Sequence, residues 1–174
     1  MKRTLLILLI TLLLTSVSFA QTRNRSSSSK SKSTASAAAQ RSAEVRTGGA
    51  TRVADQIKFL SKFIYLLGGA NSNIVAVDES IKRNQAGPDA AQKNQAAKTQ
   101  VRSSIQGFRE ALDKLEIDFR GTPELQPYYI KLAGVASGAA TAEQQAAANQ
   151  FDASGRSLLN VVNRLADVLV AMRQ

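Results

Sequence analysis

The stretch VRSSIQGFREALDKLEIDF, residues 101–119, decides the fold class of this chain. Its apolar side chains recur at alternating intervals of four and three residues: Val101, Ile105, Phe108, Leu112, Leu115 and Phe119. This spacing places them on one face of an α-helix, because one turn takes about 3.6 residues. A helix with one apolar face must bury that face. We therefore expect a helix from about Pro88 to Gly121 that packs against other helices.

The same spacing continues on the N-terminal side of this stretch. The apolar positions there are Val53, Ile57, Leu60, Ile64, Leu67, Ala70, Ile74, Val77 and Ile81. The pair Gly68-Gly69 interrupts them and costs about 2 kcal/mol relative to two alanines in a helix interior. Because the apolar positions keep their spacing across the pair, we favour one long, bent helix, with two separate helices as the alternative.

On the C-terminal side, the sequence predicts a turn, a short helix and a last long helix. Pro127 suits the start of the short helix, where its missing N–H leaves no hydrogen bond unmade. Thr141 is followed three residues later by Gln144, the spacing of a capping box, so the last helix is expected to begin there. Its apolar stripe consists of Phe151, Leu158, Val162, Leu165, Leu169 and Met172. The predicted fold is all-α: residues 49–174 form an antiparallel helical bundle of three long helices plus one short helix.

The segment before the bundle is basic, rich in serine and poor in large apolar side chains. Its basic residues are Arg23, Arg25, Lys30, Lys32, Arg41 and Arg46, against the single acidic residue Glu44. From Thr47 onward the chain is nearly balanced, with 15 basic and 12 acidic residues. The segment has too little apolar surface to offset the entropy lost on ordering, so residues 21–48 are expected to form a disordered arm that ends at Gly48-Gly49.

The first twenty residues have the pattern of a secretory signal peptide. Lys2 and Arg3 precede the apolar run LLILLITLLL, and small residues follow at the end of the segment. We predict cleavage between Ala20 and Gln21, and therefore an exported protein, periplasmic or secreted. An uncleaved membrane anchor is the alternative, although the run has about half the length of a spanning helix. The rest of the chain contains no apolar segment long enough to span a bilayer.

The residues that most enzymes rely on are missing from this sequence. The chain contains no histidine and no cysteine, which removes the commonest general base, thiolate nucleophiles and the commonest metal ligands. Glu110, Asp113 and Glu116 recur every three residues, but they flank the apolar stripe and alternate with basic residues. We interpret them as a solvated ion-pair face. No catalytic, cofactor or metal site is expected, and the predicted function is non-enzymatic.

Two sets of residues are candidates for binding. The basic residues of the arm would attract an anionic surface, while Tyr128 and Tyr129 carry amphipathic rings of the kind enriched at protein interfaces. Export removes the chain from cytoplasmic nucleic acid, so a nucleic acid is not an expected partner. The leading hypothesis is an exported bundle of the cell envelope or periplasm that binds a protein partner or an anionic surface. The alternative is a structural or chaperone-like bundle in which the arm is a spacer. The sequence leaves the oligomeric state open.

Overall fold

The computed structural model describes residues 29–174, with side chains from Ser36 onward, and this part of the chain is helical without strands. The helices are α1 (Ser29–Lys82), α2 (Ala90–Gly121), α3 (Gln126–Leu132), α4 (Val135–Ala147) and α5 (Phe151–Met172). The all-α prediction is confirmed for these residues. The predicted signal peptide and its cleavage position at Ala20 and Gln21 lie outside them.

Helix α1 is a single continuous helix of 54 residues. It runs through Gly68-Gly69, and neither glycine has a positive φ, which confirms the favoured one-helix interpretation. It also begins at Ser29, twenty residues before the predicted start of the folded domain. Residues 29–48 of the segment expected to be disordered thus belong to α1, while residues 21–28 lie outside the described part. Residues 49–82 already supply a helical nucleus, so the alanine-rich segment before them can extend that helix without a nucleation cost.

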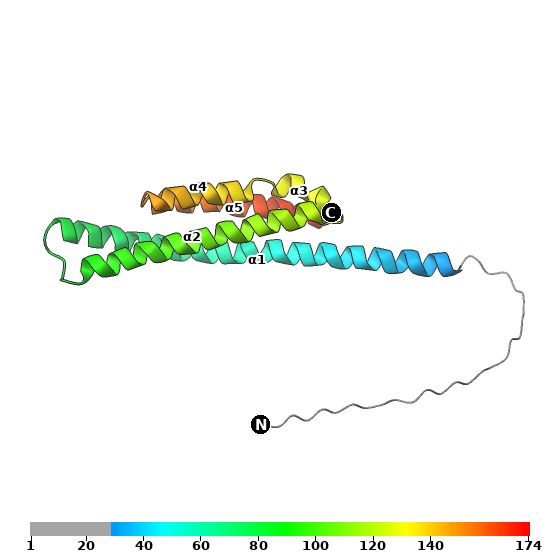
Figure 1. Ribbon diagram of the computed structural model, residues 1–174, viewed down its shortest axis with the longest axis horizontal. Coiled ribbons are helices and arrows are strands. Elements are labelled where there is room, and N and C mark those ends of the chain that lie inside the picture. The colour runs from blue at the N-terminus through cyan, green and yellow to red at the C-terminus, as the bar shows by residue number, and fades with distance from the viewer. Residues whose placement is uncertain (1–28) are drawn as a thin grey trace, which may run out of the picture.

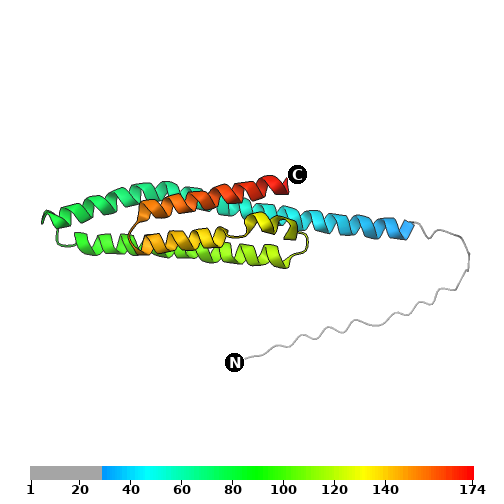
Figure 2. The same ribbon diagram turned by 90° about the horizontal axis from the view of Figure 1, so that it is seen from above.

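The helices form an antiparallel bundle in which α3 and α4 together take the place of one leg (Figure 1). Each helix packs beside its neighbour in the order α1, α2, α4, α5, and α5 closes the ring against α1. Two layers result, with α1 and α2 in one and α4 and α5 in the other, as Figures 1 and 2 show from two directions. Short connections between helices favour this arrangement.

The last two legs differ from the prediction of one short and one long helix. The chain breaks between α4 and α5 at Asn149, whose φ of 59° is left-handed. The N–H of Gln150 donates to the carbonyl of Gln145 at 2.8 Å, and the N–H of Asn149 donates to that of Ala146 at 3.0 Å. These two bonds form a Schellman motif, which ends helix α4. Thr141 lies inside α4 and donates to the carbonyl of Ser137 at 3.1 Å, so the predicted capping box is wrong.

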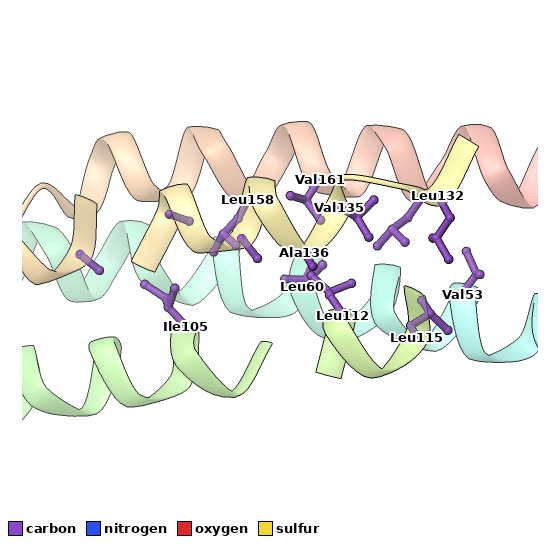
Figure 3. Packing of buried hydrophobic residues seen from close by; sticks show 14 of the residues in the cluster. Val53, Leu60, Ile105, Leu112, Leu115, Leu132, Val135, Ala136, Leu158 and Val161 are labelled. Carbon is purple, nitrogen blue, oxygen red and sulfur yellow. The ribbon is translucent and has the colours of Figure 1, made fainter. Parts of the chain in front are cut away.

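The core runs along the axis of the bundle, and Figure 3 shows its central part. Helix α1 contributes Val53, Leu60, Leu67 and Ile74, one residue every seven, which is the spacing of coiled-coil-like packing. Helix α2 buries the predicted stripe, except that Phe108 is half-buried. Helix α4 contributes mainly small side chains: Ala136, Ala139, Ala142 and Ala146. In α5, Val161 and Val168 are buried in place of the predicted Val162 and Leu169, which are only partly buried.

Charged side chains from neighbouring helices stabilise the ends of α3 and α4. The N–H groups of Gly134 and Ala136, at the start of α4, both donate to Glu116 Oε1 of α2 at 2.9 Å. At the other end of α4, Arg102 Nε donates to the carbonyl of Ala146 at 3.2 Å. Arg164 Nη2 donates to the carbonyl of Ala133, just after α3, at 2.6 Å. A carboxylate at a helix N-terminus and cations at C-termini match the signs of the helix dipole.

Candidate interaction surfaces

Four of the six predicted basic residues lie on the N-terminal part of α1, which projects beyond the bundle (Figure 1). Arg41 and Arg46 are exposed there. Lys30 and Lys32 belong to the same helix, and Arg23 and Arg25 lie outside the described residues. The basic residues from Lys30 onward are therefore carried by a helix.

The bundle holds this projecting helix through close backbone packing at Gly49. Gly49 is buried, and a Cβ built on it would lie 2.6 Å from Leu125 Cδ2 and 3.1 Å from Met172 Cε. Val45, one turn earlier, is the first residue of α1 that packs against the core. We call residues 29–48 of α1, of which Val45 packs against the core, the projecting helix.

Tyr128 and Tyr129 are buried to a similar extent. Tyr128 and Tyr129 lie on α3, and both are half-buried and packed against the core. The exposed apolar side chain of this helix is the neighbouring Ile130, which is 82% exposed. The tyrosines therefore contribute to packing, and each offers only part of its ring for a partner.

The three candidate carboxylates of α2 have different partners. Arg109 Nη1 lies 2.9 Å from Asp113 Oδ2, and Arg109 Nε lies 2.6 Å from Glu143 Oε2 on α4. The hydrogen bond that Arg109 donates to Glu143, together with the negative charge of Glu143, raises the pKa of Arg109 above its usual value. Glu110 accepts a hydrogen bond from Gln106, whereas Glu116 caps α4. The ion-pair interpretation is thus confirmed for Asp113 and corrected for Glu116. Within residues 29–174, no group of three or more acidic side chains is arranged to hold a metal ion.

A groove of about 520 Å³ opens at the end of the α1–α2 hairpin, which extends past α4 and α5 (Figure 2). Its floor is apolar, with Ala70, Ile74 and Val77 from α1 and Ala90 and Ala97 from α2. Asn94 also lines the groove, and its Nδ2 donates a hydrogen bond to Asp78 Oδ1 at 2.7 Å. These faces of α1 and α2 are the ones that α4 and α5 cover further along the bundle.

A second exposed surface lies on the side of α1 and α2 that faces away from α4 and α5. Phe59, Tyr65 and Leu66 of α1 are 59%, 83% and 56% exposed. Sequence reasoning assigned only one apolar stripe to this helix and missed them. The signal was present, because Phe59, Phe63, Leu66 and Ala70 form a second row at the same alternating spacing of four and three residues.

Comparisons with known proteins do not assign the chain to a family. No protein-family model, no curated protein and no solved structure matches it. None of the helices in residues 29–174 is both long enough and apolar enough to cross a bilayer.

Proposed function

We propose that this chain is an exported, non-enzymatic protein of the cell envelope, which binds a phosphate-bearing anionic surface through the N-terminal part of α1. The observation that carries the proposal is the continuity of α1 from the basic segment into the core of the bundle. A helix holds its cationic side chains at set spacings, whereas a flexible arm must lose conformational entropy when it binds.

The charge distribution supports the same function. Residues 21–46 carry an excess of five positive charges, while the rest of the chain from Thr47 has an excess of three spread over many more residues. Attraction to a polyanion therefore concentrates at one end of the molecule. Such attraction is strongly salt-dependent, because ions screen exposed charges within about 10 Å at 0.1 M ionic strength.

The missing residue types favour binding over catalysis. Without histidine or cysteine, acid–base or nucleophilic chemistry would need carboxylates, lysines or hydroxyl groups. Of the carboxylates that recur on α2, Glu116 caps α4, Asp113 pairs with Arg109, and Glu110 accepts a hydrogen bond from Gln106. A signal-like N-terminal segment, predicted from the sequence alone, gives the envelope as the location.

The test compares two variants of equal net charge. In the first, the described basic residues of the projecting helix are neutralised by Lys30→Gln, Lys32→Gln, Arg41→Gln and Arg46→Gln. In the control, four exposed basic residues elsewhere are neutralised by Lys93→Gln, Arg120→Gln, Lys131→Gln and Arg173→Gln. Retention on a polyphosphate matrix is measured across a salt gradient. We expect the first variant to elute at clearly lower salt than the control, whereas equal elution would reject the proposal.

A second candidate function, a chaperone-like bundle whose working surface is a groove, is favoured by the groove at the end of the α1–α2 hairpin. Its volume lies within the range typical of ligand sites, about 300–1,000 Å³, and its floor is apolar. In that case an apolar fluorescent probe would bind, Val77→Lys would weaken its binding, and neutralising the projecting helix would have no effect.

A further inference from the structure

The outer face of the α1–α2 layer combines exposed apolar side chains with lysines. We define this outer face as Lys58, Phe59, Lys62, Tyr65 and Leu66 of α1 together with Lys114 of α2. On α1, the intervals between Phe59, Lys62 and Leu66 are three and four residues, so these side chains lie along one side of the helix. Lys58 and Tyr65 stand in the adjacent row, each three or four residues from Lys62.

The outer face is open to solvent and lies over a shallow groove of about 320 Å³ between α1 and α2. Phe59 and Arg52 line it from α1, and Lys114 and Asp118 line it from α2. No residue of α3, α4 or α5 is among the side chains that line this groove. Beneath the face, the rings of Phe63 of α1 and Phe108 of α2 pack against each other, with 5.1 Å between their centroids.

The charges around the outer face have a positive excess. Two ion pairs lie at its edge: Arg52 Nη1 is 2.8 Å from Asp118 Oδ2, and Lys58 Nζ is 3.1 Å from Asp55 Oδ1. Lys62 and Lys114 form no ion pair with any described side chain, so four basic residues stand against two acidic ones. The excess continues along α1, where Arg41 and Arg46 outnumber Glu44.

This charge decides which kind of partner fits. A second copy of the chain would bring two positive faces together, and like charges placed opposite each other are repelled. An anionic partner is complementary. Phenylalanine, tyrosine and leucine flanked by lysines, along a helix about 80 Å long, match an interfacial helix, whose apolar side chains enter the boundary region of a bilayer. Tyrosine rings are favoured at that depth, and lysine stems let the charged groups reach the phosphates.

From these observations we infer that the outer face binds the surface of a bilayer that contains anionic lipid, with α1 lying parallel to the membrane. Phe59, Tyr65 and Leu66 enter the headgroup region, while Lys58, Lys62 and Lys114 contact lipid phosphates. This inference rests on the proposed function and deepens it. It names the anionic surface as a lipid bilayer and assigns the contact to the bundle as well as to the projecting helix.

The absence of tryptophan from the chain allows a direct test. The Tyr65→Trp variant introduces a single tryptophan into the outer face, and the Ile130→Trp variant introduces one into an equally exposed position on α3. Each is mixed with vesicles of phosphatidylcholine containing 30% phosphatidylglycerol, and with vesicles of phosphatidylcholine alone. We expect a blue shift and protection from acrylamide for Tyr65→Trp with the anionic vesicles only, and neither effect for Ile130→Trp.

A pair of variants tests whether vesicle binding depends on the outer face or on exposed apolar side chains anywhere on the molecule. Phe59→Ser with Leu66→Ser removes apolar contacts from the outer face. Leu159→Ser with Val170→Ser removes two apolar residues of comparable exposure from α5. Thermal melting by circular dichroism confirms that both variants fold. We expect the outer-face variant to bind anionic vesicles about tenfold more weakly than the control, because interfacial binding scales with buried apolar area.

Failure of this inference can be told apart from failure of the proposed function by adding the polyphosphate matrix. Suppose that the protein is retained on the matrix, that both serine variants bind vesicles equally, and that Tyr65→Trp shows no blue shift. This result would overturn the assignment of the outer face as a membrane-binding surface and leave the anionic-surface function intact. Loss of both retention and vesicle binding would overturn both. A dimer in sedimentation equilibrium that the outer-face variant abolishes would show that the face joins copies of the chain, which also overturns the inference.

Discussion

Glu116 of α2 and Gly134, which precedes α4, are joined by a hydrogen bond of 2.9 Å from the Gly134 N–H to Glu116 Oε1. The same oxygen accepts from the N–H of Ala136. Gly134 has a φ of 92°, so the chain turns sharply there and exposes the first N–H groups of α4. A carboxylate from a neighbouring helix thus takes the place of a local capping residue. It ties α4 to α2 where the third leg of the bundle is broken.

Removing this cap is expected to destabilise the fold. Glu116→Ala should lower the free energy of unfolding by about 1–2 kcal/mol, because it leaves two partly buried N–H groups without their acceptor. Glu116→Gln should lose less, since its amide oxygen still accepts. Urea unfolding measures both. Glu110→Ala is the control, because Glu110 accepts only from Gln106, and it should change stability by less than about 0.5 kcal/mol. Equal losses at residues 110 and 116 would contradict the capping role.

The glycine pair in α1 predicts a gain in stability on substitution. No atom of a neighbouring helix lies within 4 Å of where a Cβ would lie on Gly68 or Gly69, and both are in right-handed helix. Gly68→Ala with Gly69→Ala should therefore raise the free energy of unfolding by up to about 2 kcal/mol. Gly138→Ala is the opposite case, because its Cβ would lie 2.8 Å from Val161 Cγ2. A loss of stability in the double variant would mean that the helix does not run straight through the pair.

The burial pattern of α5 predicts that two leucines of this helix contribute very differently to the stability of the fold. Leu165 is fully buried, whereas Leu159 is 49% exposed. Leu165→Ala should cost about 2–5 kcal/mol, since it removes core contacts and leaves a cavity. Leu159→Ala should cost much less. Chemical denaturation of both variants measures the difference, and similar costs would show that α5 is rotated relative to the core.

The left-handed residue after α1 predicts a preference for glycine. Asn84 has a φ of 55°, and the N–H of Gln85 donates to the carbonyl of Ser80 at 2.9 Å in a Schellman motif. Asn84→Ala should cost about 1 kcal/mol because a Cβ without a polar group is strained in this conformation, while Asn84→Gly should be neutral or stabilising. Thermal melting of the two variants checks the order, which a right-handed conformation at Asn84 would reverse.

The helices with a regular apolar repeat were predictable from the sequence, and the break in the last leg was not. Helix α2 agrees with the prediction within two residues, since one row of large apolar side chains dominates it. Helix α4 buries alanines instead, and alanine gives almost no contrast between buried and exposed faces. The break at Asn149 was visible only as the dipeptide Asn149-Gln150. The same dipeptide, Asn84-Gln85, also ends α1.

The sequence predicted which residues are candidates for binding, but not the structural elements and contacts in which they lie. Composition identified the basic segment, yet composition averages over residues and does not register that 29–48 continue a helix nucleated elsewhere. The capping role of Glu116 depends on contact between α2 and α4, two helices that are distant in sequence. The exposed outer face was missed because α1 has two rows of apolar side chains, one buried and one exposed. Only the buried row was counted in the sequence.

The distance between residues 36 and 72 tests the central claim, that α1 is one helix from the basic segment into the bundle. Ser36 and Ser72 are exposed, and the chain has no cysteine, so Ser36→Cys with Ser72→Cys provides two unique sites for spin labels. Pulsed electron paramagnetic resonance then measures the distance between the labels. A continuous helix predicts a narrow distribution near 54 Å, at about 1.5 Å per residue. A broad distribution centred near or below about 40 Å would show a flexible arm before Gly49 and contradict the account.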